Sequence, residues 1–408
     1  MKLLVFAHVP PPHHGQSQMV QYLVEGFRRR PELGIEVYHV DTRLSEDLKD
    51  VGSARGGKLP RLLRYCREAR RLGRQQGVRA IYYVPSPPRR TPLYRDWLAL
   101  MRLRGRFPEL IYHWHSAGLG DWVEREARPW ERAITRRLLG RPALSLVLAE
   151  VLRPDAEYFQ SLRTEVVNNA VDDPCPDFAY RLKPIRRARV DRRRAAGGEV
   201  RVLFLALCSQ DKGIFDALEA VARANAEAAS GIRAGGRLQF HLTVAGGFPD
   251  SETERLVRER MAAPDVAGCV EYAGFLKGEA KRAVMESSDV LLFPSYYAFE
   301  THPLSVVEAM AFGLPVVATR WRGIPEMLPG RLADLVEPGD PAGLALELAR
   351  SAVSDRGPAL RTRYEQRYTL DRFLERLAAA LKTVESPASA AAWSGPGAAS
   401  FEGPGSGA

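Results

Sequence analysis

Cysteine is scarce in this chain of 408 residues, which has four: Cys66, Cys175, Cys208 and Cys269. None of them lies in a Cys-x-x-Cys pair or near a histidine at the spacing of a zinc site, so neither a disulfide framework nor a structural metal centre is expected. Four scattered thiols are typical of a reducing compartment. The sequence also has no Asp-x-Asp after a predicted strand. We therefore expect no divalent metal in an active site and no cofactor.

Long apolar runs are absent as well. No stretch reaches the roughly 18–20 consecutive apolar residues that a membrane-spanning helix needs. The N-terminal MKLLVFAHVPPP is too short in apolar sequence for a signal peptide and predicts a first β-strand over residues 2–9. We therefore expect a cytoplasmic protein.

The composition is that of a globular enzyme, with 45% hydrophobic and 26% charged residues, and the length predicts two or three domains. Predicted strands alternate with predicted helices up to Leu148, and the alternation starts again at Val200 after the hinge-like VVNNAVDDPCPDF. Such alternation predicts parallel sheets. The expected fold is α/β, with two Rossmann-like parallel-sheet domains that face each other across a cleft.

Four parts are expected along the chain. Residues 1–170 and 171–365 form the two Rossmann-like domains, and residues 366–384 form a final amphipathic helix. The Ala-, Ser-, Gly- and Pro-rich residues 385–408 predict a disordered tail. The arginine-rich residues that end at Gly198 are expected to be a surface connection.

Basic residues gather in residues 1–170, which have 29 Lys and Arg against 18 Asp and Glu. Such a half can bind nucleic acid, contact an anionic membrane surface or be a solvated face. No zinc-finger, RNP or helix-turn-helix signature accompanies the charge, so no nucleic-acid partner is expected. The other two alternatives stay open for a helix predicted over Leu59–Gln76. Its six arginines recur at helical spacings and are called the arginine stripe: Arg61, Arg64, Arg67, Arg70, Arg71 and Arg74.

Ligands of open parallel sheets bind outside the carboxyl ends of the strands, so the residues that follow each strand are candidates for a site. Gly15 follows the first strand and precedes a helix, where a phosphate can approach the backbone closely. An ordinary turn is the alternative. His113 and His115 alternate with Tyr112 and Trp114, so both face one side of their strand. A metal pair lacks a third ligand nearby, and a buried core histidine is the alternative for His113.

The second half has three such points. Lys212-Gly213 follows a strand, and the lysine can neutralise a diphosphate, although a loop lysine beside a turn glycine fits equally. Glu300 and Glu308 are eight residues apart, just over two helical turns, so both carboxylates can face one cleft and accept hydrogen bonds from hydroxyls. The helix predicted to start near Leu304 directs free N–H groups at any phosphate nearby.

The third point is Gly274-Phe275-Leu276, which follows a strand. Backbone groups there can contact the edge of a nucleobase, and an ordinary turn is the alternative.

The motif FETHPLSVVEAMAFGLPVVAT, with its Glu-x7-Glu spacing, resembles that of the GT-B-fold retaining glycosyltransferases of family GT4. Further segments resemble the family: Lys-Gly after a strand, VVNNAVDD at the hinge, WRGIPEML, and HHGQSQMV at the N-terminal glycine loop. The resemblance covers nearly all of residues 1–384 and is strongest in the C-terminal half.

The resemblance implies roles for individual residues. Glu300 and His115 would be catalytic, with Glu300 at the donor sugar and the reacting centre. Glu308 would hold the ribose hydroxyls, Lys212 the diphosphate, and His113 is a further candidate. The donor-binding set lines the cleft: Gly15, Lys212, Gly213, Leu276, Leu304 and Glu308. The N-terminal domain would be the acceptor side, and the final helix would cross back to it.

One position departs from the family, which usually has an arginine five residues before the lysine. This chain has Leu207 there. Either another arginine, for which Arg320 and Arg322 are the candidates, or backbone N–H groups would bind the diphosphate instead.

The leading hypothesis is an enzyme that moves a sugar from a nucleotide diphosphate sugar to a hydroxyl acceptor with retention of configuration and without a metal. A glycan or lipid-linked acceptor of bacterial surface polysaccharide synthesis is expected, with reversible contact at the inner face of the cell membrane left open. The alternative is a non-catalytic GT-B-fold nucleotide-binding or partner protein, which Leu207 supports.

Overall fold

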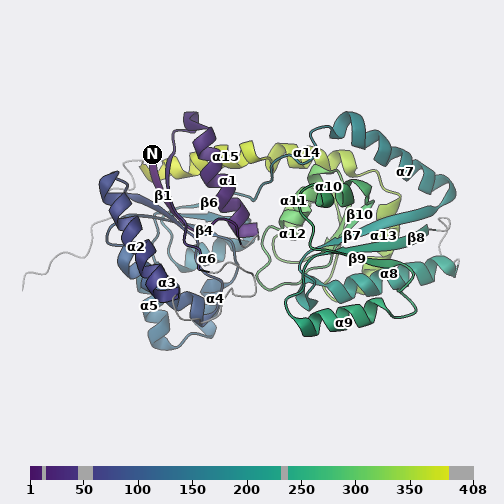
Figure 1. Ribbon diagram of the computed structural model, residues 1–408, viewed down its shortest axis with the longest axis horizontal. Helices are drawn as coiled ribbons and strands as arrows, with labels where there is room; N and C mark the ends of the chain where they lie inside the picture. The colour runs from purple at the N-terminus through teal and green to yellow at the C-terminus, as the bar shows by residue number, and fades with distance from the viewer. Residues whose placement is uncertain (12–14, 45–57, 231–237, 386–408) are drawn as a thin grey trace, which may run out of the picture.

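Two six-stranded parallel sheets organise the protein (Figure 1). The computed structural model describes residues 1–11, 15–44, 58–230 and 238–385. Part of the predicted glycine loop, residues 12–14, and nearly all of the predicted tail lie outside the described residues. Both sheets are parallel throughout. The predicted class, two Rossmann-like α/β domains, is therefore confirmed.

The N-terminal sheet has the strand order β2-β1-β3-β4-β5-β6. The strands β3, β4 and β5 are almost entirely buried because helices cover both faces, and they therefore appear in the sequence as continuous apolar runs. Alternate residues of β1 pack against α1 and α15 on one face and against α2 and α3 on the other. The strands have these bounds: β1 Lys2–Phe6, β2 Glu36–Val40, β3 Ala80–Tyr83, β4 Glu109–Trp114, β5 Leu144–Val147 and β6 Thr164–Val166. The helices are α1 Gly15–Arg29, α2 Lys58–Gln75, α3 Arg90–Leu103, α4 Leu119–Arg125, α5 Pro129–Leu139 and α6 Arg153–Tyr158.

The C-terminal sheet has the order β12-β11-β10-β7-β8-β9, so β7 and β10 are neighbours in its centre. One face packs against α8, α9 and α13, and the other against α10, α11, α12 and α14. The strands are β7 Gly198–Leu205, β8 Leu238–Ala245, β9 Val270–Gly274, β10 Val290–Phe293, β11 Val316–Thr319 and β12 Asp334–Val336. The helices are α8 Ile214–Ala229, α9 Ser251–Met261, α10 Gly278–Ser287, α11 Leu304–Ala311, α12 Ile324–Met327, α13 Pro341–Ala352 and α14 Gly357–Arg367.

The last helix, α15 (Leu370–Lys382), leaves the C-terminal domain and lies along the N-terminal one (Figure 1). Its buried Phe373, Leu374, Leu377 and Leu381 join the core that α1 forms with the first sheet. Apolar residues at helical spacing give α15 this buried face. The chain therefore crosses between the domains twice, once before β7 and once between α14 and α15.

The domains also meet through hydrogen bonds to backbone atoms. The carboxylate of Glu326 accepts the N–H of Glu150 at 2.8 Å and that of Val151 at 2.9 Å. The hydroxyl of Thr301 donates to the carbonyl of His115 at 3.4 Å. In each case the C-terminal domain contributes the side chain and the N-terminal domain the backbone.

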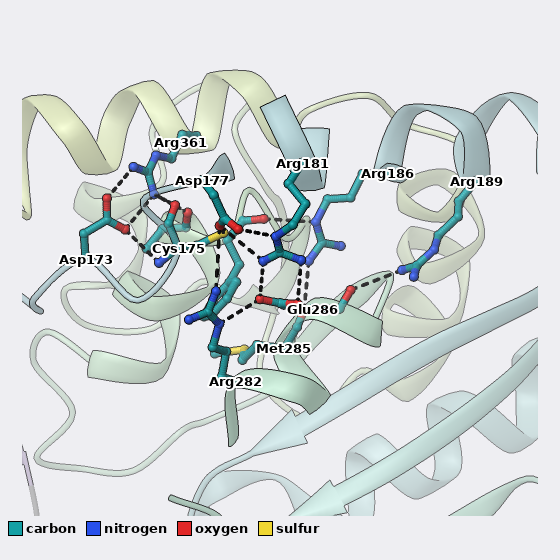
Figure 2. Close-up of polar contacts among 12 residues, drawn as sticks. Asp173, Cys175, Asp177, Arg181, Arg186, Arg189, Arg282, Met285, Glu286 and Arg361 are labelled. Atoms are coloured by element: carbon teal, nitrogen blue, oxygen red, sulfur yellow. Dashed lines mark hydrogen bonds and ion pairs between the residues drawn. The ribbon is translucent and has the colours of Figure 1, made fainter. Parts of the chain in front are cut away.

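The arginine-rich residues before β7 form the helix α7 (Lys183–Ala196), where we expected a surface connection. The guanidinium of Arg186 is buried and donates to the carbonyls of Met285 at 2.8 Å, Ser288 at 2.7 Å and Phe312 at 3.0 Å (Figure 2). These carbonyls lie at the C-terminal ends of α10 and α11, where the last carbonyl groups of a helix have no N–H donor of their own and favour cations.

Other arginines of this region are bound in the same way. Arg193 donates to the carbonyl of Ala352 at 2.8 Å and pairs with Asp289 at 2.9 Å. Arg181 pairs with Glu286 at 2.6 Å (Figure 2). Much of the charge of this run therefore holds the C-terminal domain together.

Candidate active site

The carboxylates of Glu300 and Glu308 each pair with a lysine. Glu300 precedes α11 and accepts the Nζ of Lys212 at 2.6 Å. Glu308 lies on α11 and accepts the Nζ of Lys281, which belongs to α10. The Glu-x7-Glu spacing thus presents two carboxylate–ammonium pairs at one end of the second sheet.

The Glu300 carboxylate is buried and held from two sides. Its Oε2 accepts the hydroxyl of Ser295 at 2.8 Å in addition to the Lys212 ammonium. The ammonium also lies 4.4 Å from the centre of the Tyr297 ring, a cation–π distance. The indole Nε1 of Trp321 donates to the Tyr297 carbonyl at 2.8 Å and fixes this loop. The Lys212–Glu300 pair is therefore held in a largely buried site.

Gly213 places Lys212 beside this loop. Its φ is +77°, in the left-handed region that favours glycine, and an added Cβ would lie 2.2 Å from the carbonyl oxygen of Pro294. Only glycine allows so close an approach. The loop after β7 therefore touches the loop after β10, and the Tyr296 N–H donates to the Asp211 carbonyl at 2.9 Å.

His113 is a core residue. It is fully buried in β4, its Nδ1 lies 2.6 Å from the Tyr82 hydroxyl, and burial lowers its pKa to about 3. The ring is therefore neutral at physiological pH, which matches the core alternative. His115 lies at the end of β4, with its ring centre 4.3 Å from that of His113. Its carbonyl accepts the Thr301 hydroxyl, so this end of β4 lies next to the Glu300 segment.

Gly15 and Leu304 also meet across the domains. A Cβ added to Gly15 would lie 3.6 Å from Cδ1 of Leu304, an ordinary contact distance. Leu304 packs against the cores of both domains. The N-termini of α1 and α11, which both favour anions, are therefore neighbours.

The arginine candidates lie differently. Arg320 pairs with Glu337 at 3.2 Å, and both side chains are exposed. Arg322 lies 5.4 Å from the Trp321 ring, which in turn bonds the Tyr297 loop beside Lys212. Of the two, Arg322 is thus linked to the lysine site. Leu207, where the family usually has an arginine, is 41% exposed.

Leu276 follows β9 and packs partly buried against the C-terminal core. Its neighbour Phe275 is 61% exposed, a large apolar surface just past a strand end. Sequence reasoning named Leu276 there and missed this exposed ring. It also missed Lys281 and Ser295. The position of Ser295 after a predicted strand could have marked it as a candidate. Lys281 lies 27 residues from Glu308, and no sequence pattern links the two.

Two absences apply to the part of the chain that the structure describes. His, Cys, Asp and Glu side chains do not gather there in groups of three or more that suit a metal ion. No helix among the same residues has both the length and the apolar character that crossing a bilayer requires.

Known proteins resemble this chain over its second half and in its overall fold. The family model of Glycosyl transferases group 1 matches residues 199–352. The chain is 30% identical to the amylovoran biosynthesis glycosyltransferase AmsK of Erwinia amylovora over 156 residues, 37% of this chain and 35% of that protein. It is 30% identical to the MMP alpha-(1->4)-mannosyltransferase of Mycolicibacterium hassiacum over 239 residues, 56% of this chain and 53% of that protein. The aligned parts thus cover between about a third and about half of these relatives.

A solved structure matches nearly the whole chain. The crystal structure of Anabaena Alr3699/HepE in complex with UDP and glucose has a TM-score of 0.64 and 15% identity, and the match covers 94% of this chain and 100% of that one. At this identity the likeness concerns the fold. Two facing parallel-sheet domains of this kind define the GT-B fold of glycosyltransferases. The chain therefore has the GT-B fold, and its residues 199–352 resemble glycosyltransferases of the GT4/GT1 type, as the motifs predicted.

Proposed function

We propose that this protein transfers a sugar from a nucleotide diphosphate sugar to a hydroxyl acceptor, with retention at the anomeric carbon and without a metal ion. The observation that carries the proposal is the buried Lys212–Glu300 pair beside the N-terminus of α11. It brings a cation for the leaving diphosphate and a carboxylate for the sugar within 2.6 Å of each other.

Donor binding would exchange partners within this site. The diphosphate takes the Lys212 ammonium, and the N–H groups at the start of α11 add to it. The Glu300 carboxylate, still held by Ser295, then faces the sugar. Glu308 accepts the ribose hydroxyls, with Lys281 holding its carboxylate in place.

The chemistry of transfer fits these groups. The transition state has positive charge on the sugar ring and negative charge on the departing diphosphate. Fixed groups of opposite sign stabilise both charges best where water is excluded. Lys212 stabilises the leaving group, which is the electrostatic work that a metal performs in other enzymes. The neighbouring acceptor hydroxyl attacks from the face that the diphosphate leaves, and closure of the domains about residues 166–173 excludes water.

The acceptor would approach from the N-terminal domain, where the end of β4 with His115 meets the Glu300 segment. Relatives in amylovoran biosynthesis favour a glycan or lipid-linked acceptor of bacterial surface polysaccharide synthesis. All six arginines of the stripe on α2 are exposed, so this helix could hold the protein reversibly on the inner face of the cell membrane, with no inserted segment.

A thermal-shift panel of nucleoside diphosphates and their sugars tests the donor side, since a ligand at 100 times its Kd adds about 2.7 kcal/mol of stability. Slow hydrolysis of the bound donor without an acceptor tests catalysis, and NMR of the released sugar reports the configuration at its anomeric carbon. A donor that binds and is never hydrolysed or transferred would instead favour a non-catalytic GT-B-fold binding protein. The exposed Leu207 is the observation on the side of that second candidate.

A further inference from the structure

A cavity with a volume of about 320 Å³ lies where both domains meet α14 and α15. The N-terminal domain contributes Glu150 and Asn168 to its wall, and the C-terminal domain contributes His302 and Glu326. Neither Lys212, Glu300 nor Glu308 lines it. It is therefore separate from the candidate donor site.

Three arginines from α14 and α15 converge on this cavity: Arg363, Arg367 and Arg376. None of their guanidinium groups pairs with a carboxylate in the part of the chain that the structure describes. Arg363 donates to the Glu326 carbonyl at 2.9 Å. Arg376 donates to Asn168 Oδ1 at 3.3 Å and to the Arg367 carbonyl at 3.2 Å. These are neutral acceptors, so three like charges lie around one space without a counter-charge of their own.

The two glutamates of the wall offset the three arginines only in part. The carboxylate of Glu150 pairs with Arg153, which does not line the cavity. Both carboxylate oxygens of Glu326 accept neutral backbone N–H groups of the N-terminal domain, so its negative charge remains at the wall. The charge around the cavity is therefore positive on balance.

The imidazole of His302 is the second observation. It is only 2% exposed, and among the described residues neither of its ring nitrogens has a hydrogen-bond partner. Its ring packs edge-on against Tyr368, with the centres 5.1 Å apart, and Tyr368 also lines the cavity. Buried polar groups in native proteins nearly always have partners. An unpartnered buried imidazole and an excess of positive charge at the same wall both point to a ligand that is anionic and accepts or donates hydrogen bonds.

We propose that this cavity binds a small, soluble molecule that carries a phosphate group. Guanidinium groups bind phosphate oxygens in bidentate geometry and remain charged when partly buried. The volume falls in the range of about 300–1,000 Å³ that small-molecule pockets have. The wall is built from both domains, α14 and α15. A ligand bound in the cavity therefore stabilises the domain arrangement described above. The ligand therefore acts on the cleft without entering it.

Calorimetric titration with inorganic phosphate, pyrophosphate and a hexose phosphate, at constant ionic strength, tests the proposal. The protein carries Lys212→Ala in all titrations, so that phosphates do not bind at the donor site. Arg367→Gln with Arg376→Gln should weaken binding of at least one of these ligands by about tenfold or more. Arg372→Gln is the matched control, because Arg372 is an exposed arginine of α15 that pairs with Glu375 and does not line the cavity.

The result that overturns the proposal is the absence of saturable binding, or equal affinity in the double variant and the control. Arg367→Gln alone keeps the test valid if the double variant is unstable, since the Arg367 side chain makes no hydrogen bond or ion pair among the described residues. Its melting temperature without ligand should equal that of the parent. A phosphate that raises the parent's melting temperature but not that of Arg367→Gln supports the cavity as the site.

Discussion

Replacement of Glu300 by glutamine separates the two roles assigned to its carboxylate. In the free protein the carboxylate holds the Lys212 ammonium at 2.6 Å, and the two side chains are only 8% and 18% exposed. A nucleoside diphosphate must therefore compete with Glu300 for the lysine. Glutamine keeps the shape and the Ser295 hydrogen bond but removes the charge. With UDP, which is bound in the HepE structure, as the probe nucleotide, we expect Glu300→Gln to bind it more tightly while transferring sugar far more slowly.

The magnitudes follow from the contacts. A hydrogen bond to a charged group contributes about 1.5–3 kcal/mol. Part of it persists with the amide oxygen, so a release of about 1 kcal/mol, roughly a fivefold gain in UDP affinity, is expected. The lost negative charge near the sugar removes transition-state stabilisation, which typically costs about 10²–10³ in kcat. Affinity and turnover should thus move in opposite directions.

Calorimetry gives the UDP affinity, and single-turnover transfer at saturating donor gives the chemical step. Glu308→Gln is the control, because a ribose-binding carboxylate should lose UDP affinity on the same change. Weaker UDP binding by Glu300→Gln would show that the carboxylate supports the diphosphate rather than competing with it. Near wild-type transfer would remove Glu300 from the catalytic residues.

Further predictions concern other parts of the protein. Glu308→Ala should weaken UDP and its sugar alike by about 1–3 kcal/mol in calorimetry, because ribose hydroxyls lose their acceptor; unchanged UDP affinity contradicts this role. Burial lowers the pKa of His302 to about 3 in the folded protein, from 6.5 in the unfolded chain. Near and below pH 6.5 the unfolded chain therefore binds the extra proton, and the free energy of unfolding decreases as the pH falls. Between pH 7 and pH 5, the free energy of unfolding measured in urea should therefore fall by about 2 kcal/mol less in His302→Phe than in the parent protein. An equal fall in both proteins refutes this. Replacement of Arg64, Arg67 and Arg71 by glutamine should weaken the flotation of the protein with anionic vesicles at low salt. If the parent protein does not float with these vesicles, the membrane contact is refuted. Transfer should persist in chelator, and loss restored by magnesium or manganese would show a metal requirement.

The fold and the shared location of Lys212 and Glu300 were accessible from sequence for the same reason. Apolar strands buried on both faces are distinctive, and residues that follow parallel strands share one edge of the sheet. Because β7 and β10 are neighbours, the loops that follow them touch. The sequence pattern thus assigned both residues to one edge of a sheet, but it did not predict that these side chains, 88 positions apart, pair with each other.

Contacts that depend on the reach of a long side chain were not accessible. Arg186 donates to carbonyls about a hundred positions away, and its sequence neighbours show only a basic run. Lys281 and Glu308 likewise belong to two helices whose packing no periodicity encodes. The arginine-rich run was therefore expected to be a connection, and the three-arginine cavity had no counterpart in the sequence.

The bonds between the domains have a consequence for how such chains diversify. The side chains of Glu326 and Thr301 form hydrogen bonds with peptide groups of the other domain, those of Glu150, Val151 and His115. A peptide group is the same whichever side chain its residue has. Substitutions on the N-terminal side can therefore accumulate without loosening these bonds. The sequence of the first domain can therefore change while these bonds to the second domain are kept, and exchange of the first domain between relatives becomes a practical experiment.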